Sequence, residues 1–110
     1  MYPVLVNTIK KTLDDHKAED IQIINLKGTN PFTDYYLIAT VNNERQLGAI
    51  GDYIEEAVEA KGGEVRRKEG SGDSGWVIYD CESVIVHIFL ESTRKEIKLE
   101  ELVNKIIKNK

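Results

Sequence analysis

The segment Glu69–Trp76, E-G-S-G-D-S-G-W, contains residue types that two kinds of enzyme use. A serine between an aspartate and a glycine, as in G-D-S-G, can act as a nucleophile when a base activates it. Alternatively, Gly70-Ser71 could hold a triphosphate while Asp80 and Glu82 hold a divalent metal, usually magnesium. The segment therefore raises two chemical hypotheses, hydrolysis and nucleotidyl transfer.

The hydrolysis hypothesis lacks a general base. A serine nucleophile needs such a base within hydrogen-bond reach and a third group that orients the base. The chain has only two histidines, His16 at the polar end of a predicted helix and His87 inside a predicted strand. The nucleophile elbow G-x-S-x-G would also require glycine where Trp76 stands. The sequence therefore does not support a serine hydrolase.

Nucleotidyl transfer has the right residue types in an unfavourable arrangement. Phosphate binding by Gly-Ser amides works best at a helix N-terminus, whereas only glycine-rich residues separate Ser71 from the strand that begins at Trp76. The plainer interpretation of the segment is a mobile connection between strands, because glycine, serine and aspartate favour turns. A metal-dependent, nucleotide-binding protein remains the alternative hypothesis.

The flanking elements follow from apolar periodicity and turn residues. Leu5, Ile9 and Leu13 recur at a spacing of four residues, and Leu47, Ile50, Ile54 and Val58 line a second helical face between Asn43 and Gly62-Gly63. Stretches rich in β-branched and aromatic residues predict strands. The predicted helices cover residues 3–17, about 44–61 and 99–107, and the predicted strands cover 20–26, 35–41, 64–68, 76–80 and 83–90.

This order predicts a single α/β domain over residues 1–110, with a mixed sheet of about five strands and helices packed against it. The short Cys81-Glu82 link predicts an antiparallel hairpin. The basic strand 64–68 suits an edge position, where charged side chains discourage unwanted pairing. The helix after strand 35–41 would be a crossover if the strands on either side of it were parallel neighbours.

Composition excludes several classes of protein. The net charge of −4 and the pI near 5.2 argue against sequence-specific binding of naked nucleic acid, which needs a basic footprint. The single cysteine, Cys81, excludes an intramolecular disulfide and a multi-cysteine zinc site. No signal peptide and no apolar run of about 20 residues is visible. We therefore expect a cytoplasmic protein with no membrane partner, metal or cofactor.

Trp76 and His87 are the two residues that a plain connecting loop does not explain. A tryptophan that opens a strand after a polar loop can anchor a protein interface or cap the core. A lone histidine without a carboxylate or cysteine nearby makes no metal site. We therefore expect His87 to be a sheet or core residue.

Five segments in order resemble the Iojap family of ribosomal silencing factors: T-D-Y-Y-L-I-A-T, N-E-R-Q-L-G-A-I, V-R-R-K-E-G, W-V-I-Y-D and V-I-V-H-I-F. The resemblance runs from about Ala18 to Leu102. Its matched positions are Asp34, Tyr35, Glu44, Arg45, Gln46, Glu69, Gly70, Trp76, Asp80, His87 and Arg94.

This resemblance implies a translation repressor rather than an enzyme, on a nucleotidyltransferase-like fold without the active site. Members of the family bind the large ribosomal subunit through ribosomal protein L-fourteen, block association with the small subunit, and often form homodimers. A protein interface of this kind predicts partner-binding residues around an aromatic anchor. The candidates are Trp76, Arg66, Lys68, Tyr79 and Asp80, although the period of two places Tyr79 on the opposite strand face from Trp76.

The chain departs from the family pattern in two regions. Glu82-Ser83 replaces the usual Gly-Asp of the hairpin, which removes a glycine that adopts positive φ without strain. Near the C-terminus, Glu96, Ile97 and Val103 stand where the family usually has aromatic residues. We expect these changes to affect partner binding more than the fold.

Overall fold

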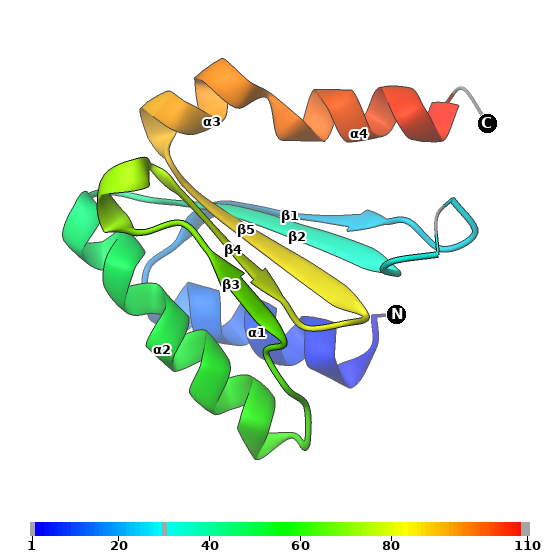
Figure 1. Ribbon diagram of the computed structural model, residues 1–110, viewed down its shortest axis with the longest axis horizontal. Helices are drawn as coiled ribbons and strands as arrows, with labels where there is room; N and C mark the ends of the chain where they lie inside the picture. The colour runs from blue at the N-terminus through cyan, green and yellow to red at the C-terminus, as the bar shows by residue number, and fades with distance from the viewer. Residues whose placement is uncertain (1, 30, 109–110) are drawn as a thin grey trace.

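The computed structural model describes residues 2–29 and 31–108, which form one mixed sheet between two layers of helices (Figure 1). The elements in chain order are α1 (Val4–Asp15), β1 (Glu19–Asn25), β2 (Tyr35–Val41), α2 (Glu44–Ala60), β3 (Arg67–Glu69), the 3₁₀ turn η1 (Gly72–Ser74), β4 (Trp76–Asp80), β5 (Val84–Leu90), α3 (Glu91–Ile97) and α4 (Leu99–Lys108). The predicted α/β fold is confirmed.

The sheet has the order β1-β2-β5-β4-β3. β2 and β5 pair in parallel at its centre, from Tyr35 opposite Val84 to Val41 opposite Leu90, and the other neighbours pair antiparallel. The predicted hairpin between β4 and β5 is confirmed. Because β5 and β4 lie between β2 and β3, the parallel-neighbour condition for a crossover by α2 is not met.

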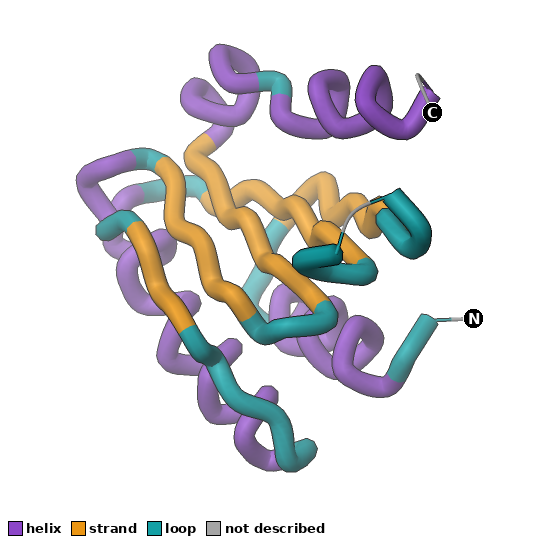
Figure 2. The backbone as a smooth tube through the Cα atoms, turned by 45° about the vertical axis from the view of Figure 1, so that its right-hand side comes forward, coloured by secondary structure: helices purple, strands orange, loops and turns teal. Residues whose placement is uncertain are grey.

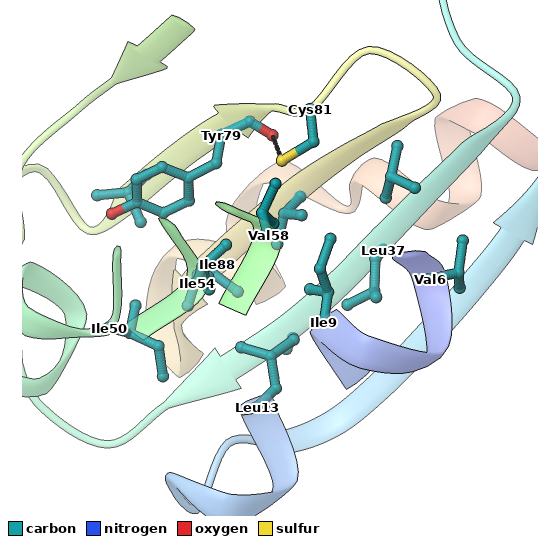
Figure 3. Packing of buried hydrophobic residues seen from close by; sticks show 14 of the residues in the cluster. Val6, Ile9, Leu13, Leu37, Ile50, Ile54, Val58, Tyr79, Cys81 and Ile88 are labelled. Carbon is teal, nitrogen blue, oxygen red and sulfur yellow. Dashed lines mark hydrogen bonds between the residues drawn. The ribbon is translucent and has the colours of Figure 1, made fainter. Parts of the chain in front are cut away.

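The first face of the sheet is covered by α1 and α2. Both helices place their apolar stripes on it, and Ile9, Leu13, Ile54 and Val58 are fully buried there. Figure 3 shows these side chains packed against the central strands, with Ile88 of β5 among them. Burial of each such side chain stabilises the fold by about 1.5–3 kcal/mol, so this layer is the main core.

The second face is covered by α3 and α4, which run together above the sheet (Figure 2). Val103 of α4 is buried against Ile24, Leu26, Ile38 and Phe89. α4 lies above the half of the sheet that contains β1 and β2, whereas β3 and β4 lie at the other side (Figure 1). The helical cover on this face is therefore partial.

Arg94 of α3 ties the C-terminal helices to the first strands. Its guanidinium donates hydrogen bonds to the carbonyl of Asp20 in β1 and to Oγ1 of Thr40 in β2, each at 2.8 Å, and it pairs with Glu100 of α4 at 2.7 Å. The Arg94 side chain is only 10% exposed. Hydrogen bonds to a charged group are stronger than neutral ones, and these hold the α3–α4 unit in place.

Two sequence-based assignments need correction. The edge strand is Arg67–Glu69 rather than 64–68, because pairing with β4 begins only where Arg67 lies opposite Asp80. Helix α3 was not predicted, since Glu91–Ile97 has no apolar period and no buried residue. The chain then turns at Lys98, which has a φ of 52° and separates α3 from α4.

Helix α2 begins where Asn43 and Gln46 predict it. The side chain of Asn43 accepts a hydrogen bond from the backbone N–H of Gln46 at 2.8 Å, and the side chain of Gln46 reaches back to the N–H of Asn42. Such caps satisfy donors that the first helical turn leaves free. The helix ends at Ala60 just before Gly62, which has a φ of 81°.

Candidate functional site

The open half of the second face carries the candidate site. On β4, Trp76, Ile78 and Asp80 alternate with the buried Val77 and Tyr79, as the period of two requires. Trp76 lies opposite Phe89 of β5, Ile78 opposite His87, and Asp80 opposite Ile85. Tyr36 of β2 lies opposite Ile85 on the other side of β5.

Four half-buried apolar side chains thus lie on neighbouring strands. We call the set formed by Trp76, Ile78, Ile85 and Tyr36 the Trp76 surface. Neighbouring and diagonal residues on adjacent strands lie within reach of one another, so the set forms one patch. Aromatic and aliphatic groups of this kind provide most of the binding energy at protein interfaces.

The indole ring of Trp76 is held on two sides. Its Nε1–H donates a hydrogen bond to Nδ1 of His87 at 3.2 Å. Its ring stacks on Phe89, with ring centroids 4.9 Å apart and planes 24° apart. The ring of Tyr36 packs against the imidazole of His87, with ring centroids 4.6 Å apart. Trp76 is only partly buried, but these contacts fix its position.

His87 is a neutral residue at physiological pH. It is only 5% exposed, and burial lowers the pKa of its imidazole to about 4, because the charged form is poorly solvated there. Since Nδ1 accepts the hydrogen bond from Trp76, the proton of the neutral ring is on Nε2. The prediction that His87 is a sheet residue is confirmed.

A charged pair borders the Trp76 surface at the end of β4. The guanidinium of Arg66 lies 3.5 Å from Oδ1 of Asp80, and the same oxygen accepts a hydrogen bond from the backbone N–H of Glu82. Arg66 also donates its backbone N–H to the Asp80 carbonyl at 2.8 Å. Of the five sequence candidates, the structure thus brings Arg66 and Asp80 into contact, while Trp76 lies on the same strand face at the other end of β4.

Lys68 and Tyr79 lie on the other side of the sheet. Lys68 pairs with Glu55 of α2, and this contact is the main cause of the raised pKa of its ammonium. Tyr79 is 6% exposed and packs among the core residues (Figure 3). A β-carbon on Gly51 of α2 would lie only 2.2 Å from the Tyr79 hydroxyl. Including Tyr79 among the surface candidates was therefore wrong, and Lys68 is directed away from Trp76.

The serines of the loop make hydrogen bonds within the loop itself. The N–H of Ser71 donates to Oγ of Ser74 at 3.1 Å, and the hydroxyl of Ser71 donates to the Asp73 carboxylate. The Ser74 hydroxyl lies within hydrogen-bond distance of the carbonyls of Ser71 and Trp76. These contacts form a reciprocal cap around η1, which orders the approach to Trp76.

The residues that nucleotidyl transfer would need are not gathered in one place. Ser71 precedes β4 and Asp80 ends it, so a five-residue strand of about 16 Å separates them. Within residues 2–29 and 31–108, no group of three or more histidine, cysteine, aspartate or glutamate side chains could hold a metal ion. The geometry gives no support to the transferase alternative.

Sequence reasoning missed part of the surface. Ile78 shares its strand face with Trp76, so the period of two was a sufficient signal for it. Ile85 and Tyr36 join the surface only because β5 lies between β4 and β2. Local sequence patterns do not determine this strand order.

Comparison with known proteins identifies the family. A family model described as "Ribosomal silencing factor during starvation" matches residues 2–109. The chain belongs to the ribosomal silencing factor family. Thus the resemblance seen in the five sequence segments is confirmed over almost the whole chain.

Individual ribosomal silencing factors show the same relationship. The chain is 34% identical to "Ribosomal silencing factor RsfS" of Halalkalibacterium halodurans over 89% of this chain and 84% of that protein. It is 35% identical to the Bacillus subtilis protein of the same name, over 81% of this chain and 75% of that protein. "Protein Iojap, chloroplastic" of Arabidopsis thaliana is 31% identical over 84% of this chain, which spans 39% of that longer protein.

Solved structures agree with the fold. A crystal structure from Bacillus halodurans matches with a TM-score of 0.78 and 34% identity, covering 89% of this chain and 91% of that one. One from Chromobacterium violaceum matches with a TM-score of 0.84 over 89% of this chain and 82% of that one, at 23% identity. Among the residues described here, no helix has both the length and the apolar character that a membrane span requires.

Proposed function

We propose that this chain represses translation in the cytoplasm by docking on the large ribosomal subunit through the Trp76 surface. Membership of the ribosomal silencing factor family supports a ribosomal partner. The observation that carries the choice of surface is Trp76 itself, which is half-buried, fixed by His87 and Phe89, and surrounded by apolar neighbours. Ribosomal protein L-fourteen is the proposed contact.

The composition of the surface indicates what the contact must provide. Trp76, Ile78 and Ile85 form an apolar centre, while Arg66 and Asp80 form a polar rim. Protein interfaces with such a centre and rim bury about 800 Å² on each partner. The partner therefore has to present a complementary apolar group, and the net charge of −4 favours encounter with a basic protein.

Repression would follow from occupancy. A factor bound at the face where the subunits meet covers area that the small subunit needs, so inhibition scales with the bound fraction and requires no chemical step. The use of Ser71, Ser74 and Asp80 in local structure is consistent with such a role.

The first test is co-sedimentation with purified bacterial large subunits. Trp76→Glu should weaken binding at least thirtyfold, because the contact would bury an unpaired carboxylate at the centre of the interface. Tyr53→Glu is the matched control, since Tyr53 is a 45% exposed aromatic residue on α2, on the other face of the sheet. Circular dichroism checks that both variants fold.

Two outcomes would contradict the proposal. Equal binding by wild type and Trp76→Glu would remove the Trp76 surface from the interface. Binding without any reduction of subunit joining in a sucrose gradient would contradict steric repression. Pull-down with purified L-fourteen then tests the named contact directly.

A further inference from the structure

His87 supplies a hydrogen-bond acceptor in a place where packing alone would favour an apolar side chain. It lies 5% exposed beside Phe89 and beneath Trp76 and Tyr36. In the described part of the chain its Nε2 has no hydrogen-bond partner, and a buried unpaired N–H is destabilising. A leucine or phenylalanine would avoid this cost. Stability alone therefore does not explain why an imidazole stands at this position.

What the imidazole does contribute is the Nδ1 lone pair. Nδ1 lies 3.2 Å from the indole Nε1 of Trp76, and an imidazole that is neutral offers one acceptor nitrogen. The indole N–H is a donor only. His87 is therefore matched to Trp76 in hydrogen-bond character as well as in shape.

The contact also selects one orientation of the indole. Stacking on Phe89 at 4.9 Å restricts the tilt of the ring but permits it to slide or flip in its plane. A hydrogen bond from Nε1 defines which edge of the indole faces His87 and which faces the solvent. Fixing a side chain before binding reduces the conformational entropy that association would otherwise lose.

We propose that His87 is a positioning residue for docking, which holds Trp76 in its binding-competent orientation through the Nδ1 acceptor. This inference rests on the proposed function, because it concerns the orientation of the proposed anchor. His87 itself stays buried beneath Trp76 and does not touch the partner.

A matched pair of substitutions separates the acceptor from the packing. In His87→Asn the side-chain oxygen lies near the position of Nδ1. The leucine of His87→Leu has nearly the same shape as asparagine but no hydrogen-bond acceptor. If His87 acted only by filling space, leucine would be the better replacement, because an amide in an apolar cluster is costly. If the acceptor matters, asparagine is the better replacement for docking even though it is the less stable variant.

We expect His87→Leu to bind large ribosomal subunits about tenfold more weakly than wild type, the upper range for loss of one hydrogen bond. His87→Asn should recover most of that loss. Binding by His87→Leu that equals or exceeds binding by His87→Asn, with both variants folded, overturns the inference.

A second readout needs no ribosome. Trp76 is the only tryptophan, so the protein gives a single indole N–H signal in a ¹H–¹⁵N NMR spectrum. Hydrogen exchange of that proton should be slow in wild type and in His87→Asn, and faster in His87→Leu. Equal exchange in all three proteins would show that Nδ1 does not hold the indole.

The failure of this inference can be told apart from the failure of the proposed function. If Trp76→Glu binds like wild type, the Trp76 surface is not the interface, whatever His87 does. If Trp76→Glu loses binding and His87→Leu does not, the surface stands and only the positioning role of His87 is refuted.

Discussion

The two faces of the sheet differ in how completely their side chains are covered. On the first face, α1 and α2 bury Ile9, Ile54 and Tyr79 beneath two full helices. On the second, α4 covers Ile38 and Phe89 but leaves neighbouring apolar residues only partly buried. The first face therefore provides most of the stability, and the second is the face on which we propose that a partner docks.

The largest expected contrast comes from truncating one isoleucine on each face. Ile54→Ala should lower the free energy of unfolding by about 4 kcal/mol, because it leaves a cavity in a closed core. Ile78→Ala should lower it by only about 2 kcal/mol, since Ile78 is not fully buried and its truncation leaves no closed cavity, yet it should weaken ribosome binding. Urea denaturation measures both values; similar stability losses would remove the distinction between the faces.

Acid should destabilise the protein through His87, which lies on the second face. Its pKa is 6.5 when exposed and about 4 in the folded protein. Stability from the neutral ring is therefore complete above pH 6.5 and is lost as the pH falls towards 4, by roughly 3 kcal/mol in total. Denaturation curves of wild type and His87→Leu at a series of pH values isolate this contribution, because the carboxylates titrate in both. Parallel pH dependences would contradict the assignment.

The closed face should reject even one added methyl group. In Gly51→Ala the new β-carbon would clash with the Tyr79 ring, so the variant should be less stable by about 2 kcal/mol despite its better helix propensity. Gly48→Ala is the control on the same helix, because its β-carbon would meet only ordinary contacts at 3.7 Å or more. That variant should gain up to about 1 kcal/mol. Thermal unfolding measures both variants. Equal shifts in Tm for Gly51→Ala and Gly48→Ala would contradict the predicted clash with Tyr79.

The smallest effect is expected at the hairpin that joins β4 to β5, outside both faces. Glu82 has a φ of 72°, a left-handed conformation that costs a non-glycine residue about 1 kcal/mol. Glu82→Gly should therefore stabilise the protein by up to about 1 kcal/mol. Glu82→Ala removes the same charge but keeps the β-carbon, so no such gain is expected. If alanine stabilises as much as glycine, charge rather than backbone strain is the cause.

Sequence reasoning succeeded where local signals are strong. The bounds of β2, α2 and β4 were predictable because dense apolar patterns end at residues such as Asn43 and Gly75 that favour caps and turns. It failed for α3, whose position depends on the contacts of Arg94 with Asp20 and Thr40, far away in sequence.

The candidate site divides in the same way. Trp76 and Asp80 were predictable from strand alternation and from the family resemblance. Arg66 joins the border of the surface through its ion pair with Asp80. Ile85 and Tyr36 depend on the pairing of β5 with both β4 and β2, which only tertiary structure determines.

The parallel pairing of β2 with β5 has a consequence for how the protein is made. Tyr35 pairs with Val84, so the centre of the sheet joins segments about 50 residues apart, and long-range contacts of this kind slow folding. While the chain is being synthesised, the apolar β2 strand has to wait for β5 near the C-terminus. Until β5 is available, β2 is an apolar strand with one unpaired edge, which is prone to aggregation. A factor proposed to act on ribosomes would thus depend, during its own synthesis, on translation through β5 before the centre of its sheet can form.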